Sequence, residues 1–430
     1  MGHSHDDVPE QRATPAVRRL LLLALVPLAL LTLAGLVMLW PARATLAPTS
    51  DLGFGLLVHG TVASLTEKPC PNAELDESSE DVSEFAEEPP GRCADARVLM
   101  TNGPTKGQEE ILDLSIGRTS VSVRTGSKVV LNYEASAPPG SQYQITDVQR
   151  GPPLLALGLL FSLAVVVLGR RRGLAALAGL AITFFVLIRF MLPALLAGES
   201  PVQVALVAAA VIMFVSLYIT HGFTSRTSAA VIGTLSSLVL TGLLAAVFTA
   251  WASFSGLVSE EASFISATQA QVDLRGLFLA GVVIGSLGVL DDVTVTQATA
   301  VWELRRANAA YGVRELYRAG VRIGRDHIAS TVNTLVLAYA GASLPLLILF
   351  TVSGRGIGQT LTNEVVAQEV VRSLVGGIGL VAAVPITTLT AALLAVRGEK
   401  PGVPVAGRRR RKSEEIDAEV VEWWQKLRDS

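Results

Sequence analysis

Long apolar stretches, separated by short polar segments, dominate the chain. There are eight of them: Val17–Trp40, Pro152–Gly169, Gly173–Leu196, Pro201–Thr220, Thr227–Trp251, Leu274–Leu290, Ile328–Val352 and Val370–Val396. Each is about as long as the ~20 residues that a helix needs to cross the hydrocarbon core of a membrane. None alternates as a strand does, and only helices or closed barrels satisfy their backbone hydrogen bonds in lipid. The pattern predicts an all-α polytopic membrane bundle of eight transmembrane helices.

The overall composition agrees with this class. Hydrophobic residues make up 50% of the chain and charged residues 17%, which is typical of a membrane protein. The net charge is −2, and no basic domain indicates a nucleic-acid partner. The excess of Arg over Lys and the many Ala residues favour a bacterial origin, and hence the bacterial plasma membrane.

Arginine-rich segments set the expected orientation. They lie at Arg18–Arg19, Arg170–Arg172, Arg226, Arg305–Arg325 and Arg408–Lys412. With eight spans, all of them fall on one side, which the positive-inside rule makes the cytoplasm. Both termini are therefore expected to be cytoplasmic. The first stretch could instead be a cleaved signal peptide, but its apolar core exceeds the usual ~7–15 residues, and this favours an uncleaved anchor.

These expectations divide the chain into five parts. They are a cytoplasmic tail at 1–16, a transmembrane anchor at 17–40, an extracytoplasmic domain at 41–150, a seven-helix membrane domain at 151–396 and a cytoplasmic basic tail at 397–430.

The segment 41–150 holds short runs rich in strand-forming residues, separated by turns that contain Gly. The runs are Gly53–Leu65, Ala96–Thr101, Glu110–Ile116, Thr119–Arg124, Lys128–Asn132 and Gln142–Asp147. Five or six such strands predict a small β-rich barrel or sandwich. The two cysteines of the chain, Cys70 and Cys93, both lie here, and an oxidising compartment makes a disulfide the natural expectation. The acidic loop at 76–88 between them is interpreted as a solvated insertion, and metal binding by it is left open.

Residues 307–327 are predicted to form an amphipathic cytoplasmic helix. Arg314, Arg318 and Arg322 recur along it at four-residue spacing. Such a helix can lie in the membrane interface and bind anionic lipid. The alternative is that the positive charge only fixes the topology.

Several segments resemble one family. The motifs are GSLGVLDDVTVTQ at Gly285–Gln297, IGRDHIASTVNTL at Ile323–Leu335, LYITHGF at Leu217–Phe223 and SEEA at Ser259–Ala262. Together they are similar to the YibE/F-like family of bacterial membrane proteins, over roughly residues 125–396. The resemblance implies a multi-pass membrane protein.

Polar residues at the end of the sixth stretch are the main candidate site. Asp291, Asp292, Thr294, Thr296 and Gln297 form a polar run, and an ionised carboxylate in hydrocarbon costs several kcal/mol, about 2.5–3.5 at a helix centre. The run is therefore a candidate site for a proton, a cation or a substrate. The alternative is a hydrated helix end paired with nearby arginines.

The start of the seventh stretch adds further candidates. His327 suits a proton relay, Arg325 suits anionic groups, and Asn333 lies one to two turns farther along. A structural salt bridge and a helix cap are the competing interpretation of these residues.

Four more residues are secondary candidates. Arg189 lies within a predicted span. Its side chain is expected either to pair with an acid of an outer loop or to extend to the membrane interface. His221 ends another span. Glu260 and Glu261 lie in a predicted external loop. They could gate an external mouth or bind a cation, and the alternative is that they are solvated acids.

The sequence lacks a P-loop, a zinc motif, a nucleophile elbow and a dinucleotide fingerprint, so no cofactor is expected, and ATP-driven transport would need a partner subunit. The leading hypothesis is a transporter or permease with its polar track on the sixth and seventh spans. One alternative is a metal-dependent interfacial enzyme acting on a phosphorylated lipid, in which Asp291, Asp292, Glu303 and His327 would converge. Another is a membrane sensor or scaffold. An oligomer is compatible with each.

Overall fold

The computed structural model describes residues 14–41, 56–69, 92–116, 123–138, 140–269, 271–352, 354 and 356–398. The chain forms two compact units. One is Thr45–Leu174, and the other combines Met1–Ala44 with Ala175–Ser430. Each unit is described by itself.

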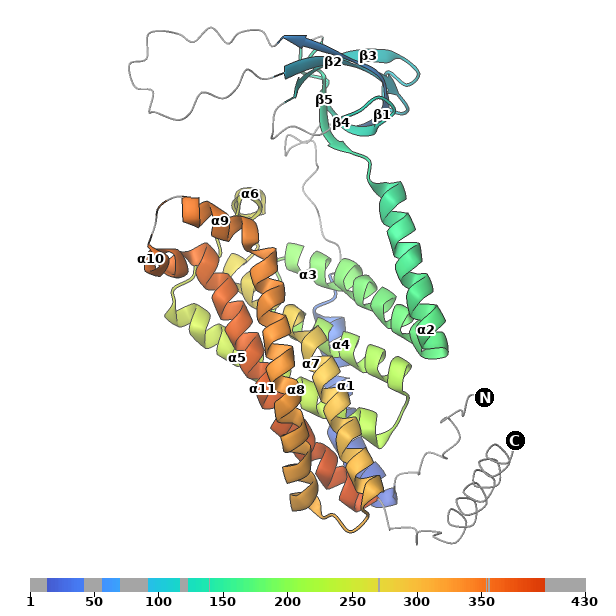
Figure 1. Ribbon diagram of the computed structural model, residues 1–430, viewed down its shortest axis with the longest axis vertical. Helices are drawn as coiled ribbons and strands as arrows, with labels where there is room; N and C mark the ends of the chain where they lie inside the picture. Colours follow the sequence, from blue (N-terminus) through green and yellow to red (C-terminus); the bar gives the residue numbers. More distant parts are fainter. Residues whose placement is uncertain are drawn as a thin grey trace, which may run out of the picture. The chain divides into compact units, whose positions relative to one another are not determined.

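The first unit contains a five-stranded antiparallel sheet. Its strands are β1 (Leu56–Pro69), β2 (Arg92–Met100), β3 (Glu109–Ile116), β4 (Lys128–Tyr133) and β5 (Tyr143–Val148). They are ordered β3-β2-β1-β4-β5 (Figure 1). The two edge strands of this curled sheet are β3 and β5. Alternate residues such as Val58, Val98 and Leu131 are fully buried and form its core, as the period of a half-buried strand requires.

Five of the six predicted strands correspond to these elements. The sixth, Thr119–Arg124, lies mostly outside the described residues. Cys93 is a buried residue of β2, whereas Cys70 and the acidic loop at 76–88 lie outside the described residues. The disulfide between Cys70 and Cys93 therefore stays a prediction.

A sharp break divides the helix that follows the sheet. Helix α2 (Gly151–Val186) has a non-helical backbone at Arg170, with φ 49° and ψ −124°. A Cβ placed on Gly173 would lie 2.2 Å from the carbonyl oxygen of Val165. Residues eight apart in a continuous helix are separated by about 12 Å, so the chain turns back at Arg170. Only glycine fits this close approach at position 173.

The second unit is a helical bundle. Its long helices are α1 (Pro15–Met38), α4 (Pro201–His221), α5 (Ser225–Trp251), α7 (Leu274–Ala307), α8 (Val313–Ala342) and α11 (Glu364–Gly398). The short ones are a π-helical turn, η2 (Leu187–Met191), with α3 (Leu192–Leu196), α6 (Glu260–Thr268), α9 (Leu344–Val352) and α10 (Ile357–Thr362). Helices α5, α7 and α11 pack against one another, and α8 packs on α7 and α11 (Figure 1).

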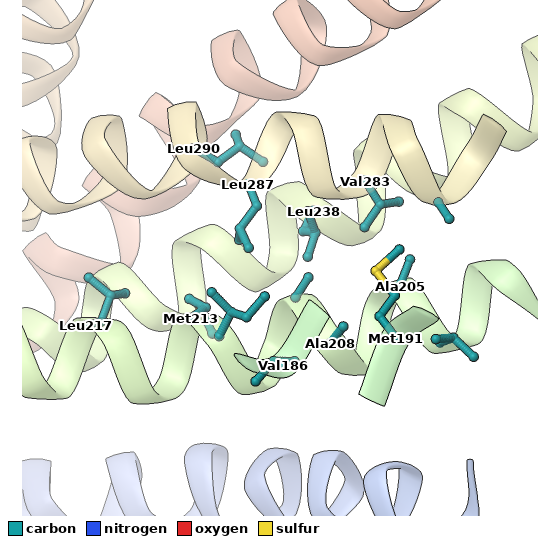
Figure 2. Close-up of a cluster of buried hydrophobic side chains, with 14 of the residues drawn as sticks. Val186, Met191, Ala205, Ala208, Met213, Leu217, Leu238, Val283, Leu287 and Leu290 are labelled. Carbon is teal, nitrogen blue, oxygen red and sulfur yellow. The ribbon is translucent and has the colours of Figure 1, made fainter. Parts of the chain in front are cut away.

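A large apolar cluster joins α4, α5 and α7. Figure 2 shows Met213 and Leu217 of α4 beside Leu238 of α5 and Leu287 and Leu290 of α7. Several alanines, among them Ala205 and Ala208, are fully buried in it. Small residues let helix backbones approach closely, which is how helices associate inside lipid.

Among the described residues, six helices are long and apolar enough to cross a membrane, or up to seven if α8 and α9, which are bent by 59°, form one span. One of the six, Gly151–Leu196, has 46 residues and includes the break at Arg170. Helix α8 also differs from the prediction, because it runs without interruption from Val313 to Ala342. The amphipathic segment predicted at 307–327 is therefore the first half of a bundle helix. Arg314, Arg318 and Arg322 are exposed on it, and their binding of lipid stays a prediction.

Candidate functional site

Helix α7 carries the main predicted site residues on two different faces. Asp291 and Asp292 lie mid-helix, because α7 continues to Ala307. Thr294 and Gln297 are buried, Asp292 and Thr296 are exposed, and Asp291 is half-buried between them. A rotation of about 100° per residue, from 3.6 residues per turn, separates the faces.

The buried face makes contacts between helices. The hydroxyl oxygens of Thr294 and Thr234 on α5 are 2.6 Å apart. The side-chain amide of Gln297 donates to the carbonyl oxygen of Gly320 on α8 at 2.8 Å and to Thr388 Oγ1 on α11 at 2.7 Å. Polar side chains buried in this way join helices. Thr294 and Gln297 therefore hold α5, α7, α8 and α11 together.

The two carboxylates of α7 have few partners. Asp291 Oδ1 is buried and accepts no hydrogen bond within the described part of the chain. Among the described residues neither Asp291 nor Asp292 forms a salt bridge. The pairing with nearby arginines that a purely structural role would need is thus not found there. A buried carboxylate oxygen without a hydrogen bond costs stability.

Helix α8 presents its polar residues on its outer face. Arg325, His327 and Asn333 are all exposed, because Gly320, Gly324 and Leu335 form the buried face of this helix. A Cβ on Gly324 would lie 2.9 Å from Gln297 Oε1, so α8 passes close to α7 at this point.

Two contacts fix the depth of these residues along the bundle. Tyr339 Oη of α8 lies 2.9 Å from the position of a Cβ on Gly285 of α7, and Gln297 of α7 meets Gly324 of α8. Asp292 and Thr296 lie between Gly285 and Gln297 on one helix. His327 and Asn333 lie between Gly324 and Tyr339 on the other. The exposed polar residues of both helices therefore occupy the same depth. We call Asp291, Asp292, Thr296, His327 and Asn333 the α7–α8 polar surface.

The polar groups continue toward the start of α11. Arg372 lies 3.4 Å from Glu369 in an ion pair, and its guanidinium carbon is 5.5 Å from the ring centroid of Phe278 on α7. Arg372 lies next to Gly281 of α7, and Tyr339 lies next to Gly285. Both residues therefore lie along α7 beyond the polar surface, on the side toward the start of this helix. Sequence analysis missed both. The available signal was a charged residue inside the apolar stretch Val370–Val396, since such residues are rare and functional in membrane helices.

The helices that carry this polar surface lie in the part of the chain that matches a known protein family. The family model described as YibE/F-like protein matches residues 157–397, which is more than half of the chain. The chain belongs to the YibE/F-like family. The match includes α4 to α11 and thus the whole α7–α8 polar surface, as the two motifs at Gly285–Gln297 and Ile323–Leu335 had indicated. No curated protein and no solved structure matches the chain.

In this YibE/F-like protein the secondary candidates lie elsewhere. Arg189 is an exposed residue of the π-helical turn η2, and no ion pair with Glu199 is found among the described residues. The side chain of Glu260 is not among the side chains that the structure describes. His221 ends α4, where its Nδ1 is 2.7 Å from Thr220 Oγ1. It borders a hollow of only about 10 Å³, which is no larger than one water.

Two acids of the YibE/F-like protein lie in the first turn of a helix and accept hydrogen bonds there. Glu261 lies in the first turn of α6, and its own backbone N–H and the Ser259 hydroxyl, which both favour the ionised carboxylate, hold its pKa below the ordinary value. Glu364, not singled out from the sequence, accepts hydrogen bonds from the backbone N–H groups of Ser255 at 2.6 Å and Gly256 at 2.9 Å. It also accepts from the Ser255 hydroxyl and the Gln368 amide. Glu364 thus ties the loop after α5 to α11.

The arrangement needed for a metal-dependent enzyme is not found among the described residues. No three His, Cys, Asp or Glu side chains come together there in a way that could hold a metal ion. In particular, Glu303 forms an ion pair with Arg306 at 3.0 Å, one turn along α7. It does not join Asp291, Asp292 and His327 in a ligand set.

Proposed function

We propose that this YibE/F-like protein is a membrane transporter or permease whose pathway follows the α7–α8 polar surface. The observation that carries the proposal is the common depth of Asp292 and Thr296 on α7 and His327 and Asn333 on α8, all of them exposed. Polar and ionisable side chains within a membrane avoid lipid and mark pathways for ions and substrates.

Two apolar segments offer little to cover this surface. Residues 151–169 contain Ser162 as their only polar side chain, and α1 has only Thr32 after its two starting arginines. Neither segment supplies hydrogen-bond partners for two carboxylates, an imidazole and an amide. In this proposal water supplies such partners, because a permeation pathway requires a water-lined surface at membrane depth.

Each residue then has a distinct part in the pathway. Asp291 and Asp292 attract a proton, a coupling cation or a cationic group of the substrate. His327, Asn333 and Thr296 donate and accept hydrogen bonds to a polar solute. Arg372, paired with Glu369, borders the pathway toward the start of α11. The depth of the two acids, one of them unsatisfied, makes them the coupling site in this proposal.

The pathway fits a chain that crosses the membrane eight times. Thr14 Oγ1 donates to the carbonyl oxygen of Arg397 at 3.0 Å, so α1 begins at the end of the bundle where α11 ends. The chain must therefore cross the membrane an even number of times from the start of α1 to the end of α11. Division of Gly151–Leu196 at Arg170, with α8 and α9 as one span, gives eight. A helix of 46 residues would be about 69 Å long, more than twice the ~30 Å hydrocarbon core.

The same proposal keeps both termini on the cytoplasmic side of a bacterial plasma membrane. Arg170–Arg172 then lie at a cytoplasmic turn, together with the arginines between α7 and α8, as the positive-inside rule requires.

Substitution of the two acids tests the function. Asp291→Asn and Asp292→Asn keep the side-chain size and remove the charge, so each variant should lose complementation of a deletion phenotype while its abundance and thermal stability remain normal. Glu303→Gln is the matched control, because it removes an exposed acid of α7 beyond the polar surface. It should complement as the unmodified protein does. Normal complementation by the double Asp→Asn variant would refute the proposed role of the acids.

A further inference from the structure

An open groove lies between α1 and α4, away from the α7–α8 polar surface. Its volume is about 790 Å³, within the ~300–1,000 Å³ that is usual for ligand sites. Its walls are apolar: one side of α1 from Leu21 to Leu36, and α4 from Val211 to Val215. Both helices belong to the same compact unit.

One end of the groove has a different chemistry. Arg18 of α1 lines it, opposite Tyr218 of α4 and the hydroxyl residues Thr224, Ser225 and Ser228 at the start of α5. Tyr218 Oη and Ser228 Oγ are 3.1 Å apart. Among the lining residues Arg18 is the only charged one. In the described part of the chain it has no ion pair.

The aromatic residues place this end at a membrane surface. Phe223 stacks on Tyr218 with ring centroids 4.6 Å apart and is itself 89% exposed. Aromatic rings gather at the level of the lipid head groups, and Arg18 lies at the start of α1, beside the end of α11. The groove therefore begins at the head groups of one leaflet and extends into its hydrocarbon.

We propose that this groove binds an anionic glycerophospholipid from the leaflet at which α1 begins. The phosphate lies against the Arg18 guanidinium and accepts hydrogen bonds from the hydroxyl residues, and an acyl chain lies between α1 and α4. The sixteen residues from Arg18 to Leu33 extend over about 22 Å of helix, more than the ~15 Å depth of one leaflet. A lone cation at the end of an apolar groove complements an anionic head group with its acyl chain. The proposal does not rest on the transport function.

Lipid retention by the full-length purified chain tests the proposal. Native mass spectrometry after exposure to mixed micelles of phosphatidylglycerol or phosphatidylcholine measures how much of each lipid stays bound. The unmodified protein should retain one phosphatidylglycerol in preference to phosphatidylcholine. Arg18→Gln should weaken this retention at least about tenfold, which corresponds to about 1.4 kcal/mol. Arg19→Gln is the matched control, since Arg19 is the neighbouring cation and does not line the groove.

A second variant tests the apolar part. Ala29→Trp fills the groove at its α1 wall and should also abolish retention, while thermal unfolding shows that the bundle is intact. If this variant fails to fold, Arg18→Gln alone decides the question. Equal retention by Arg18→Gln and Arg19→Gln would overturn the proposal. So would a dimer mass that Ala29→Trp abolishes, because the groove would then hold a second copy of the chain. Displacement of the lipid by inorganic phosphate would refute a site that needs the acyl chain.

Discussion

At the scale of single residues, the carboxylates of Glu364 and Asp291 differ in how many hydrogen bonds they accept. Glu364 is surrounded by donors from the loop after α5, whereas Asp291 Oδ1 accepts no hydrogen bond within the described residues. A fully satisfied carboxylate stabilises the fold, and an unsatisfied one costs stability. The same contrast separates Gln297, bonded to α8 and α11, from the exposed Asn333.

Removal of the charge of Glu364 should therefore destabilise the protein. Glu364→Gln replaces an acceptor-only group by an amide that cannot accept all of these bonds, at an expected cost of about 1–3 kcal/mol. Thermal unfolding in detergent measures the loss. Glu369→Gln is the control, because Glu369 lies one turn or so farther along the same helix and makes one ion pair at 3.4 Å. An unchanged melting temperature for Glu364→Gln would contradict the assigned role.

Reciprocal contacts between threonine and glycine hold α5 and α11 together at the scale of the elements. A Cβ on Gly379 of α11 would lie 2.0 Å from Thr241 Oγ1 of α5, and one on Gly233 of α5 would lie 2.1 Å from Thr387 Oγ1 of α11. The two contacts are eight residues apart on each helix, in opposite chain directions. Helices in lipid pack closely through such small residues.

This packing predicts different outcomes for two neighbouring glycines. Gly379→Ala forces α5 and α11 apart and should cost about 1–3 kcal/mol. Gly377→Ala should be neutral or stabilising by up to about 1 kcal/mol, because a Cβ there meets nothing within 4 Å and Ala favours helix. Thermal unfolding of both variants in the same detergent gives the comparison. Equal melting temperatures would contradict the close contact of α5 with α11.

In the sheet, one lysine relieves the repulsion of two acids. Asp95 of β2 lies directly opposite Asp113 of β3, and like charges in that position destabilise a sheet. Lys68 of β1 forms ion pairs with both, at 2.6 Å to Asp95. The hydrogen bond from Lys68 holds the pKa of Asp113 below its ordinary value of 3.8.

A pH dependence follows from the lowered pKa of Asp113. A carboxyl group whose pKa is lower in the folded state stabilises the fold above its unfolded pKa, and this contribution is lost as the pH falls through the folded value. The unmodified protein should therefore lose stability of the sheet below about pH 3.8. Lys68→Met should remove the part of this pH-dependent loss that comes from Asp113. Circular dichroism melts of both proteins at several acidic pH values would measure the difference. Parallel decline of both proteins would contradict the role of Lys68.

The sequence predicts the helices and strands well because each is encoded locally. Apolar stretches give the helices, and alternation with Gly-containing turns gives five strands. It does not predict that α8 runs from Val313 to Ala342, since no Gly or Pro signal decides where an amphipathic segment joins a span. Helix periodicity does place Thr294 and Gln297 on one face of α7 and Asp292 and Thr296 on another, and the burial of these residues agrees, but it does not say which face is buried. Which face of α7 is buried depends on where α5 and α11 pack, and those contacts are far apart in the chain. Tyr339 was missed for the same reason, whereas the signal for Arg372, a charge inside an apolar stretch, is present in the sequence.

At the scale of the whole molecule, the buried polar groups of the bundle join its helices, and the exposed ones of α7 and α8 lie on its outer face. The contacts of Thr234 with Thr294 and of Gln297 with Thr388 hold α5, α7 and α11 as a frame. Helix α8 packs on this frame through Gly320 and Gly324, and its remaining polar residues are exposed at the depth of Asp292. The central claim of the account is that water, and not lipid, contacts this outward face.

Thiol labelling in membrane vesicles tests that claim most directly. Single cysteines at Thr296 and Asn333, in a protein whose Cys70 and Cys93 are replaced, are exposed to a membrane-impermeant reagent. Leu243→Cys is the control: it is 61% exposed, and it lies at the depth of Asn333 because Thr241 contacts Gly379 while Leu335 contacts Gly376. The account predicts labelling at Thr296→Cys and Asn333→Cys and none at Leu243→Cys. Labelling at none of the three positions, with all three accessible to a membrane-permeant reagent, would contradict it.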